Sequence, residues 1–263
     1  MSVLSYLDNM SSTMVLTSAE KSSISTSINT IRTRINSYLG TEVREQLVFG
    51  SYTRETILPR KYDNDSDVDY MIVFYNNNGY KPQTLLNKLK QFVELYYSRS
   101  EIHQSHPTIV LELSHIKIEL VPAIKDYSGN IFIPSPANNY ADWMLTDPNG
   151  FNSKLTNVNG NNYYKIKPLI RLMKYWNVDK ANKAYSSYVL EKWIIDKGFW
   201  GCNNLKDYLF SCINDLCCNS ADPQYLKNAV ANAKSVVENV KYYERVGDII
   251  KAENEIKKII PYK

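Results

Sequence analysis

The segment from Leu47 to Phe74 constrains the fold of this chain most, because it places two apolar runs on either side of a polar one. The first run ends in Phe49-Gly50-Ser51, and the second begins with Asp67-Val68-Asp69. Residues two apart on a β-strand point to the same face, so we expect Asp67 and Asp69 to present their carboxylates together. Two like charges this close repel unless a cation lies between them, and hard oxygen ligands suit Mg²⁺ or Mn²⁺.

The turn Gly50-Ser51 precedes the acidic strand and can complement it. Its backbone N–H groups and the Ser51 hydroxyl are suitable donors for a phosphate. The segment therefore predicts a site that holds a small anion and a cation between the ends of two strands.

Hydrophobic periodicity predicts a sheet in the first part of the chain. Thr17 and Glu20 form a capping-box pattern, and isoleucines at helical spacing then predict one long helix that ends before Gly40. A second helix is predicted from Pro82 to about residue 98. Short apolar runs predict strands at residues 43–49, 67–75, 109–113, 116–123 and 131–133.

Strand patterns stop near residue 160, and helical patterns follow to the end of the chain. The predicted linker is the segment Asn157–Asn162, with the sequence NVNGNN. The predicted fold class is α+β, with a mixed sheet and a long N-terminal helix in residues 1–160, a helical lobe in residues 161–263, and the site in the cleft between them. We expect the helices of that lobe at residues 163–176, 186–199, 205–218, 223–240 and 248–259.

Composition and charge exclude several classes of protein. The net charge of +4 is mild and favours phosphate binding in a pocket over binding along a nucleic acid, which needs many phosphate contacts. The chain has no apolar run long enough to span a bilayer and no basic leader, so we expect a cytoplasmic protein without a membrane partner. The four cysteines lie far from the three histidines, and their spacing favours reduced thiols over a zinc site.

A third acid is needed if the Asp67 and Asp69 pair is to hold two metal ions. Glu119 lies among apolar residues on the strand predicted at 116–123, where an unpaired carboxylate would be costly. Two alternatives remain open at this point. Glu119 can lie on the solvent side of an alternating strand and pair with a lysine, and Glu112 competes for the same role.

Two later helices carry groups that suit a phosphate. Lys167, Arg171 and Lys174 lie opposite the apolar face of the helix at 163–176, which fits either a triphosphate grip or a solvated surface, and the helix alone favours the solvated surface. Ser186 and Ser187 begin the next helix, where hydroxyls and free N–H groups can bind phosphate. The alternative for these serines is an ordinary helix N-cap.

The order of these parts is more informative than any one of them. Metal-assisted nucleotidyl transfer requires such a set of parts. The chain supplies a strand ending in Gly-Ser, an acidic pair on the next strand, a single acid on a later strand, and Lys and Ser on helices. Three carboxylates would hold two Mg²⁺ ions, which activate a hydroxyl and stabilise the reacting α-phosphate. The Ser and Lys groups would hold the β- and γ-phosphates.

At this point the sequence resembles the nucleotidyltransferase superfamily that includes DNA polymerase β. It is more similar to the bacterial branch of cyclic-oligonucleotide synthases, the cGAS/DncV-like enzymes of antiphage defence. The resemblance spans about residues 47–193 and is thinner outside them. It is carried by Gly50-Ser51-Tyr52, Ser66-Asp67-Val68-Asp69, the strand Ile118–Ala123, the helix Ile170–Trp176 and the segment Ser187–Glu191.

The resemblance implies a role for each matching residue. Asp67, Asp69 and Glu119 would ligate two Mg²⁺ ions, with Mn²⁺ as the other suitable ion. Many relatives carry Asp where this chain has Glu119, which we interpret as tolerated because Glu is also an anionic oxygen ligand. The donor triphosphate would contact the Gly50-Ser51 turn and, at its outer phosphates, Lys174 and Ser187 with their neighbour Ser186. Tyr185 and Tyr188 would either stack on a base or pack against the helix.

The resemblance also implies an activity. Such enzymes join two or three nucleoside triphosphates through a linear intermediate into a cyclic product, releasing pyrophosphate. The implied partners are NTP substrates such as ATP and GTP and a downstream effector that binds the product, and we expect a monomer that binds no long nucleic acid. Two alternatives stay open: nucleotidyl transfer to an RNA end, a small molecule or a protein side chain, and a nucleotide-binding regulatory protein without catalysis.

Overall fold

The computed structural model of the chain describes residues 1–105, 107–135, 137 and 141–263. The chain divides into two compact units, which are described separately below. The sheet unit consists of Leu16–Arg60 and Asp65–Asn152, and the helical unit of Met1–Val15, Lys61–Asn64 and Ser153–Lys263.

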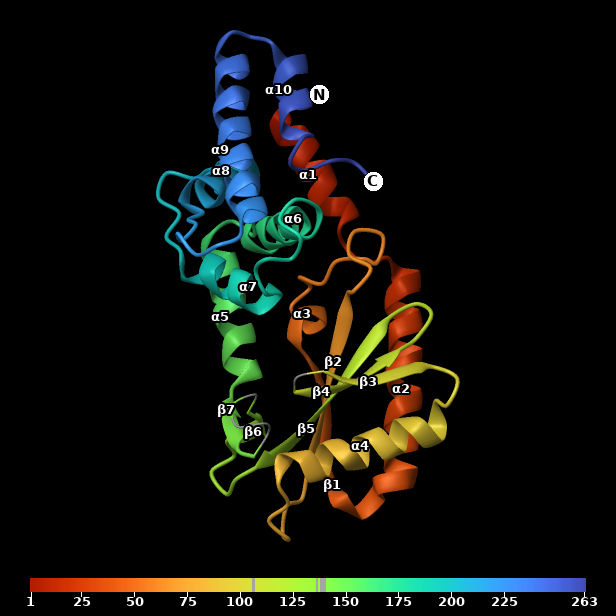
Figure 1. The fold of residues 1–263 in the computed structure, drawn as a ribbon. Coiled ribbons are helices and arrows are strands. Elements are labelled where there is room, and N and C mark those ends of the chain that lie inside the picture. The colour runs from red at the N-terminus through yellow and green to blue at the C-terminus, as the bar shows by residue number, and fades with distance from the viewer. Residues whose placement is uncertain (106, 136, 138–140) are drawn as a thin grey trace. The chain divides into compact units, whose positions relative to one another are not determined.

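A mixed sheet forms the centre of the sheet unit (Figure 1). Its strand order is β1-β2-β5-β4-β3, with β6 beside β5 and β7 beside β6. The central pair β2 and β5 is parallel, and the pairs on either side of it are antiparallel. The strands are β1 (Val43–Phe49), β2 (Asp67–Phe74), β3 (Glu101–Ser105), β4 (Thr108–Glu112), β5 (Lys117–Lys125), β6 (Ile131–Pro134) and β7 (Trp143–Thr146).

Two helices, α2 (Ser18–Leu39) and α4 (Pro82–Tyr96), cover one face of this sheet. The predicted capping box begins α2, because the Thr17 hydroxyl accepts the Glu20 N–H at 3.2 Å and the Glu20 carboxylate accepts the Thr17 N–H at 2.7 Å. The even-numbered residues of β2 are buried under these helices with the isoleucines of α2. The odd-numbered residues of β2, which begin with Asp67 and Asp69, therefore face the other side of the sheet.

The opposite face of the sheet is apolar at one end and acidic at the other. Met71, Val73 and Ala123 form a small buried cluster there, against which Leu47 and Phe49 pack. Two short elements flank β1, namely the 3-10 turn η1 (Gly40–Glu42) before it and α3 (Gly50–Thr53) after it.

The helical unit is organised around α6, which packs against α1, α7 and α8. Side chains on nearly all sides of α6 are buried, Tyr175 and Trp176 among them. Helix α5 begins in the sheet unit and ends in the helical unit. The helices are α1 (Val3–Thr13), α5 (Pro148–Asn161), α6 (Ile166–Asp179), α7 (Ser187–Asp196), α8 (Leu205–Asp215), α9 (Gln224–Arg245) and α10 (Ile249–Ile256).

Three local predictions need correction. The segment Asn157–Asn162 is not a linker, because all but its last residue belong to α5. Asn159 in this segment is buried, and its side-chain oxygen accepts the Lys167 N–H at 3.1 Å near the start of α6, so tertiary packing overrides the low helix propensity of Asn and Gly. The sequence did not predict α1, nor the edge strands β3 and β7, which are largely exposed and lack an alternating apolar pattern.

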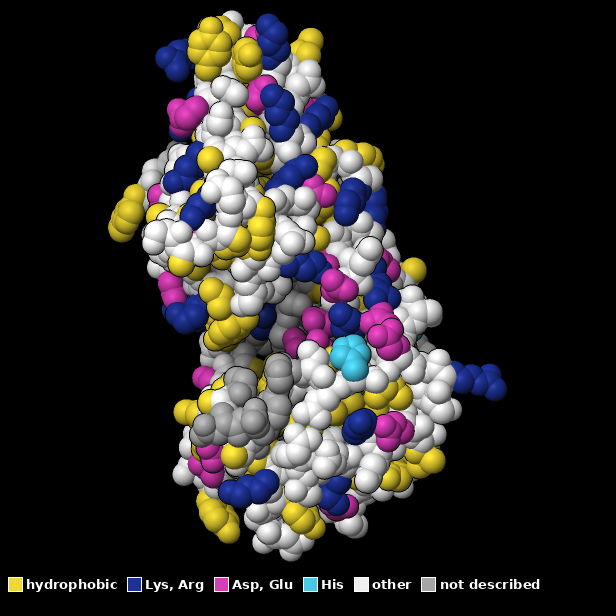
Figure 2. Space-filling model, in the orientation of Figure 1, with side chains coloured by type: hydrophobic (Ala, Val, Ile, Leu, Met, Phe, Trp, Pro, Cys, Tyr) yellow, Lys and Arg dark blue, Asp and Glu magenta, His cyan; other side chains and the backbone are white. Residues whose placement is uncertain are grey.

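The surface carries charges of both signs. On the face shown in Figure 2, Lys and Arg side chains lie among Asp and Glu side chains rather than in one continuous stripe. Within the described part of the chain, every helix is too short or too polar to cross a membrane.

Candidate active site

The parallel pairing of β2 and β5 brings three acids onto one face of the sheet. In this register Asp67 lies opposite Lys117, and Asp69 lies opposite Glu119. Paired residues on neighbouring strands share a face, and such strands lie about 4.8 Å apart. Asp67, Asp69 and Glu119 are therefore neighbours on the face that α2 and α4 leave uncovered.

The surroundings of Glu119 differ from those of an ordinary surface carboxylate. Burial raises the pKa of Glu119 to about 7, and repulsion by Asp67 adds to this shift. The Thr108 hydroxyl donates to Glu119 Oε2 at 3.2 Å, which lowers the pKa but does not offset the other two causes. Glu119 is half-buried, and its raised pKa favours the site interpretation over that of a solvated glutamate paired with a lysine.

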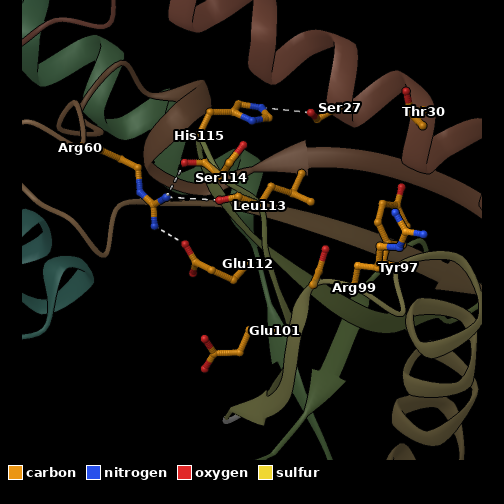
Figure 3. A pocket seen from close by; sticks show the side chains of 11 residues that line it. Ser27, Thr30, Arg60, Tyr97, Arg99, Glu101, Glu112, Leu113, Ser114 and His115 are labelled. Atoms are coloured by element: carbon orange, nitrogen blue, oxygen red, sulfur yellow. Dashed lines mark hydrogen bonds and ion pairs between the residues drawn. The ribbon is translucent and has the colours of Figure 1, made fainter.

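The competing acid Glu112 is already neutralised. Its carboxylate forms an ion pair with the Arg60 guanidinium, which also donates to the carbonyl oxygens of Leu113 at 3.3 Å and Ser114 at 3.4 Å (Figure 3). This group borders a cavity of about 640 Å³, which Ser27 and His115 also line. Because Arg60 compensates its charge, Glu112 is a poorer choice than Glu119 for the third acid.

Gly50 provides the space in which the Asp69 carboxylate lies. It directly follows β1, in which Phe49 is paired with Asp69. A Cβ atom on Gly50 would lie 2.7 Å from Asp69 Cγ and closer still to Oδ2, and the glycine has a φ of +75°. A side chain is therefore excluded both by the close approach and by the backbone conformation.

The turn after Gly50 is held by its own backbone. The Ser51 carbonyl oxygen accepts the N–H groups of Thr56 at 3.0 Å and Ile57 at 3.1 Å. These bonds fix the half-buried Ser51 beside Gly50, at the same end of the sheet as Asp69.

Two residues to which the sequence assigned no role, Thr108 and Ser66, support the strands that carry the acids. Thr108 bonds Glu119 directly. The buried Ser66 hydroxyl donates to the Leu58 carbonyl oxygen at 2.6 Å and so fixes the chain immediately before Asp67. The Arg54 guanidinium lies over the Phe151 ring at 4.8 Å. The position of Ser66, a polar residue directly before a buried strand, could have indicated its supporting role. Nothing in the sequence singled out Arg54.

The basic residues of α6 are buried, so the solvated interpretation of this strip is wrong for two of them. Only 5% of Lys174 and 7% of Arg171 is exposed. The Lys174 ammonium forms an ion pair with the fully buried Glu191 of α7, and the Arg171 guanidinium donates to the Ser11 carbonyl oxygen at 3.4 Å. Lys167 is half-buried. Lys174 and Arg171 are largely shielded from solvent because α6 packs against α1, α7 and α8.

The start of α7 presents one capping serine and two exposed residues. The Ser186 hydroxyl accepts the Val189 N–H at 3.3 Å, so the N-cap alternative is correct for Ser186. Ser187 and Tyr188 are exposed in the first turn. Tyr185 stacks on Trp176 with ring centroids 6.3 Å apart, as the packing alternative predicted.

The fit of the acidic cluster to a metal depends on its chemistry. Its side chains offer hard anionic oxygens, the kind that Mg²⁺ and Mn²⁺ prefer, and burial followed by repulsion from Asp67 raises the pKa of Glu119. In their present rotamers, no three His, Cys, Asp or Glu side chains of the described residues converge as metal ligands. The donor set therefore fits a divalent cation, and its use as a metal site stays a prediction.

Comparison with known proteins gives a consistent result. The model of the family described as Second Messenger Oligonucleotide or Dinucleotide Synthetase domain, SMODS, matches residues 1–159. A probable cyclic nucleotide synthase of Bacillus cereus is 27% identical over 238 residues, which cover 74% of this chain and 65% of that protein. The chain thus spans just under two thirds of the length of this curated relative.

Two solved structures have the same fold. Escherichia coli MS115-1 CdnC, solved in complex with HORMA-deltaN, has a TM-score of 0.72 at 10% identity, covering 98% of this chain and 96% of that chain. The CD-NTase CdnG of Bradyrhizobium diazoefficiens, solved with GTP, has a TM-score of 0.67 at 12% identity, covering 97% of each. The predicted α+β fold, with its mixed sheet, long N-terminal helix and helical second part, is confirmed.

Proposed function

The chain belongs to the SMODS family of second messenger oligonucleotide or dinucleotide synthetases, and from this premise we propose that it joins nucleoside triphosphates into a cyclic di- or trinucleotide and releases pyrophosphate. One observation carries the proposal. Three carboxylates from two parallel strands lie together on the open face of the sheet, and Glu119 is held there with a raised pKa. Such a cluster costs stability unless a cation occupies it, and a divalent cation is the partner that phosphoryl chemistry supplies.

Asp67, Asp69 and Glu119 would hold two divalent ions, with Mg²⁺ as the proposed metal. When bound, these ions would supply charge stabilisation at the α-phosphate and an activated hydroxyl nucleophile. Gly50 leaves room for the Asp69 carboxylate and so fixes its orientation. Thr108 donates to Glu119 and holds its carboxyl group toward the cluster.

The resemblance implies which groups would contact the triphosphate of the donor nucleotide. Ser51 would contact it from the turn after β1, and Ser187 would offer its hydroxyl and the free N–H groups in the first turn of α7. Ser186 and Tyr188 flank this position. The resemblance would have Lys174 contribute positive charge to the outer phosphates, whereas in this structure its ammonium group is buried in an ion pair with Glu191.

The proposal extends to the biological role. The product would act as a second messenger that reaches a downstream effector, in a bacterial antiphage signalling system. The family match and the cyclic nucleotide synthase named among the relatives support a second-messenger product, and the antiphage role is implied by the sequence resemblance alone. A monomer in the cytoplasm that binds no long nucleic acid stays a prediction from the sequence.

The test is to incubate purified protein with Mg²⁺ and the four NTPs, and to follow pyrophosphate release and phosphatase-resistant product by mass spectrometry. We expect Asp67→Asn and Asp69→Asn each to abolish the product. Asp65→Asn is the matched control, because Asp65 is exposed just before the same strand and pairs with Lys117 at 3.7 Å.

Two outcomes would contradict the proposal. Unchanged yield in the Asp67 and Asp69 variants would show that the cluster is not catalytic. Incorporation of labelled nucleotide only in the presence of added RNA would instead favour transfer to an RNA end.

A further inference from the structure

A second cavity lies at the end of the sheet remote from the acids, and it has a volume of about 720 Å³. This volume falls within the range of roughly 300–1,000 Å³ that is typical of small-molecule sites. Its lining residues belong to the start of β1, the C-terminal ends of β2 and β5 with the residues that follow them, and the strands β6 and β7. Figure 1 labels these strands. All of its lining residues belong to the sheet unit.

This cavity is separate from the acidic cluster. Phe74, which lines it, lies five residues beyond Asp69 on β2, a separation of roughly 17 Å at about 3.3 Å per residue. Phe74 also belongs to the opposite face of the sheet, because it packs in the core under α2 and α4. A ligand bound here would not contact the three carboxylates.

Aromatic rings form much of the cavity wall. Tyr75 is 51% exposed, and Phe132 and Trp143 are half-buried at the same cavity. Accessible rings from three separate segments offer flat apolar surfaces on which a base can stack.

A β-bulge in β1 places the side chain of Arg44 at the same cavity. Val43 pairs with Phe74 and Glu45 pairs with Val73, so Arg44 is the extra residue of β1 at a register shift. Bulges redirect a side chain locally and are common beside functional sites. Among the described residues Arg44 has no ion-pair partner, and its exposed guanidinium lines the cavity. This geometry presents several N–H donors to an anion.

Two further polar groups complete the chemistry of the cavity. Lys125 provides a second positive charge, held only by a solvent-exposed pair with Glu45 at 3.3 Å. The one acid of the cavity wall, Asp126, is engaged by the N–H at 2.8 Å and the side-chain amide at 2.9 Å of Asn130. The cavity therefore combines aromatic walls with two cations, of which Lys125 shares its charge with Glu45 and Arg44 has no ion-pair partner among the described residues.

We propose that this cavity is a second nucleotide site, in which a base stacks among Tyr75, Phe132 and Trp143 while its phosphate binds Arg44 and Lys125. The ligand class is a nucleoside phosphate. Two sources share this chemistry, namely an NTP and a cyclic dinucleotide, and the experiment separates them. A nucleotide bound in this cavity would not compete with the substrates that bind at Asp67, Asp69 and Glu119. The nucleotide concentration could therefore affect the sheet unit through a separate site.

The test is isothermal titration calorimetry on the full chain in EDTA, with ATP, GTP, a cyclic dinucleotide and inorganic tripolyphosphate as separate ligands. Chelation removes metal-dependent binding at the acids, whereas the proposed site needs no metal. We expect binding of at least one of the nucleotides, and the strongest ligand identifies the source. Absence of binding by all of them at millimolar concentration would overturn the proposal.

Variants assign the binding to this cavity. Arg44→Ala should weaken it by about tenfold or more, and Arg44→Lys should restore most of the loss because it keeps the charge. Lys90→Ala is the control, since Lys90 is an exposed cation of α4 that pairs with Glu94. The Asp67→Asn, Asp69→Asn double variant should bind normally in EDTA. Undiminished binding in Arg44→Ala, with an unchanged melting temperature, would contradict the proposal.

Stacking of a base on the aromatic rings can be tested separately, by tryptophan fluorescence. Trp143→Phe should remove the change in tryptophan fluorescence on nucleotide binding, because the other three tryptophans, Trp176, Trp193 and Trp200, belong to the helical unit and do not line this cavity. Tripolyphosphate should bind at least about tenfold more weakly than the nucleotide, since it has no base to stack. Equal affinity for the two would overturn the base-stacking arrangement.

Discussion

Charged side chains are withdrawn from water both in the acidic cluster of the sheet unit and in the Lys174–Glu191 pair of the helical unit. The two regions differ in how this burial affects stability when no ligand is bound. Asp67, Asp69 and Glu119 are three acids on one face of the sheet, and burial together with repulsion by Asp67 makes ionisation of Glu119 costly in the folded chain. Lys174 and Glu191 compensate one another within the fold. The cluster therefore lowers stability until a ligand of opposite charge binds, whereas the pair needs no ligand.

This difference separates a binding role from a structural one. A group whose charge is uncompensated gains free energy when a cation binds, so the cluster is prepared for function at a cost in stability. A buried pair is stabilising only while both partners are present, because removal of one leaves a charge in a dry environment. The same type of substitution should therefore have opposite effects on stability in the two regions.

The largest expected effect is on catalysis. Glu119→Gln removes one charge from the cluster and should lower the rate of product formation by at least about 100-fold, since even the partners of metal ligands contribute up to about that factor. Pyrophosphate release at saturating Mg²⁺ measures the rate. Glu112→Gln is the control, because Arg60 already neutralises Glu112. Equal losses in both variants would show that the third acid has been assigned to the wrong residue.

The next effect is on stability in the helical unit. Glu191→Gln leaves the Lys174 ammonium buried without its counter-ion and should lower the free energy of unfolding by about 3–5 kcal/mol, as measured by chemical denaturation. Lys192→Gln on the same helix is the control, because its pair with Asp196 is exposed and should contribute less than about 1 kcal/mol. Similar losses in the two variants would contradict the contrast between buried and exposed pairs.

A double variant separates the two roles of Lys174. Lys174→Met with Glu191→Leu replaces the pair by apolar side chains and should recover most of the stability that Glu191→Gln loses. The double variant still lacks the ammonium group, so we expect its KM for NTP to rise by about tenfold if Lys174 holds the outer phosphates as proposed. An unchanged KM would show that Lys174 serves only the pair.

The sequence predicted the acidic cluster better than the buried pair, for a physical reason. Asp67 and Asp69 lie two residues apart at the head of an apolar run, so their common face follows from strand geometry alone. Their proximity to Glu119 depends on the register of β2 and β5, which pairs residues 50 positions apart in the chain (Asp69 and Glu119). The apolar residues around Glu119 in the sequence indicated it as a candidate for the third acid. Only the strand register showed that it lies beside Asp67 and Asp69.

The pair in the helical unit could not be read from one helix. Lys174 and Arg171 lie opposite the apolar face of α6, which is typical of solvent exposure. Their burial depends on other helices that cover this face, and Glu191 belongs to one of them. The edge strand β3 shows the same limit, because its polar sequence becomes a strand only through pairing with β4.

A smaller effect tests how the cluster is assembled. Gly50→Ala places a methyl group against the Asp69 carboxylate and should reduce activity by roughly 10–100-fold, since a displacement of about 1 Å can cost that much. Gly79→Ala is the matched control, because Gly79 also has a positive φ, of +65°, but open space around its Cα. Steady-state rates and melting temperatures of both variants separate backbone strain from the displacement of Asp69. Equal activity in the two would remove Gly50 from the site.

The smallest expected effect is on the free energy of unfolding of the metal-free protein. The pKa of Glu119 is raised from an ordinary value of 4.5 to about 7, so the folded chain holds this proton more tightly than the unfolded chain. Glu119 therefore adds stability at low pH that is lost as the pH rises from about 4.5 through about 7. In EDTA, the wild type should lose on the order of 1–2 kcal/mol more than Glu119→Gln between about pH 5 and about pH 8. Denaturation curves of the two proteins across this range measure the difference. If their slopes were equal, the cluster would hold no extra proton, and its contrast with the self-compensated pair would lose its electrostatic basis.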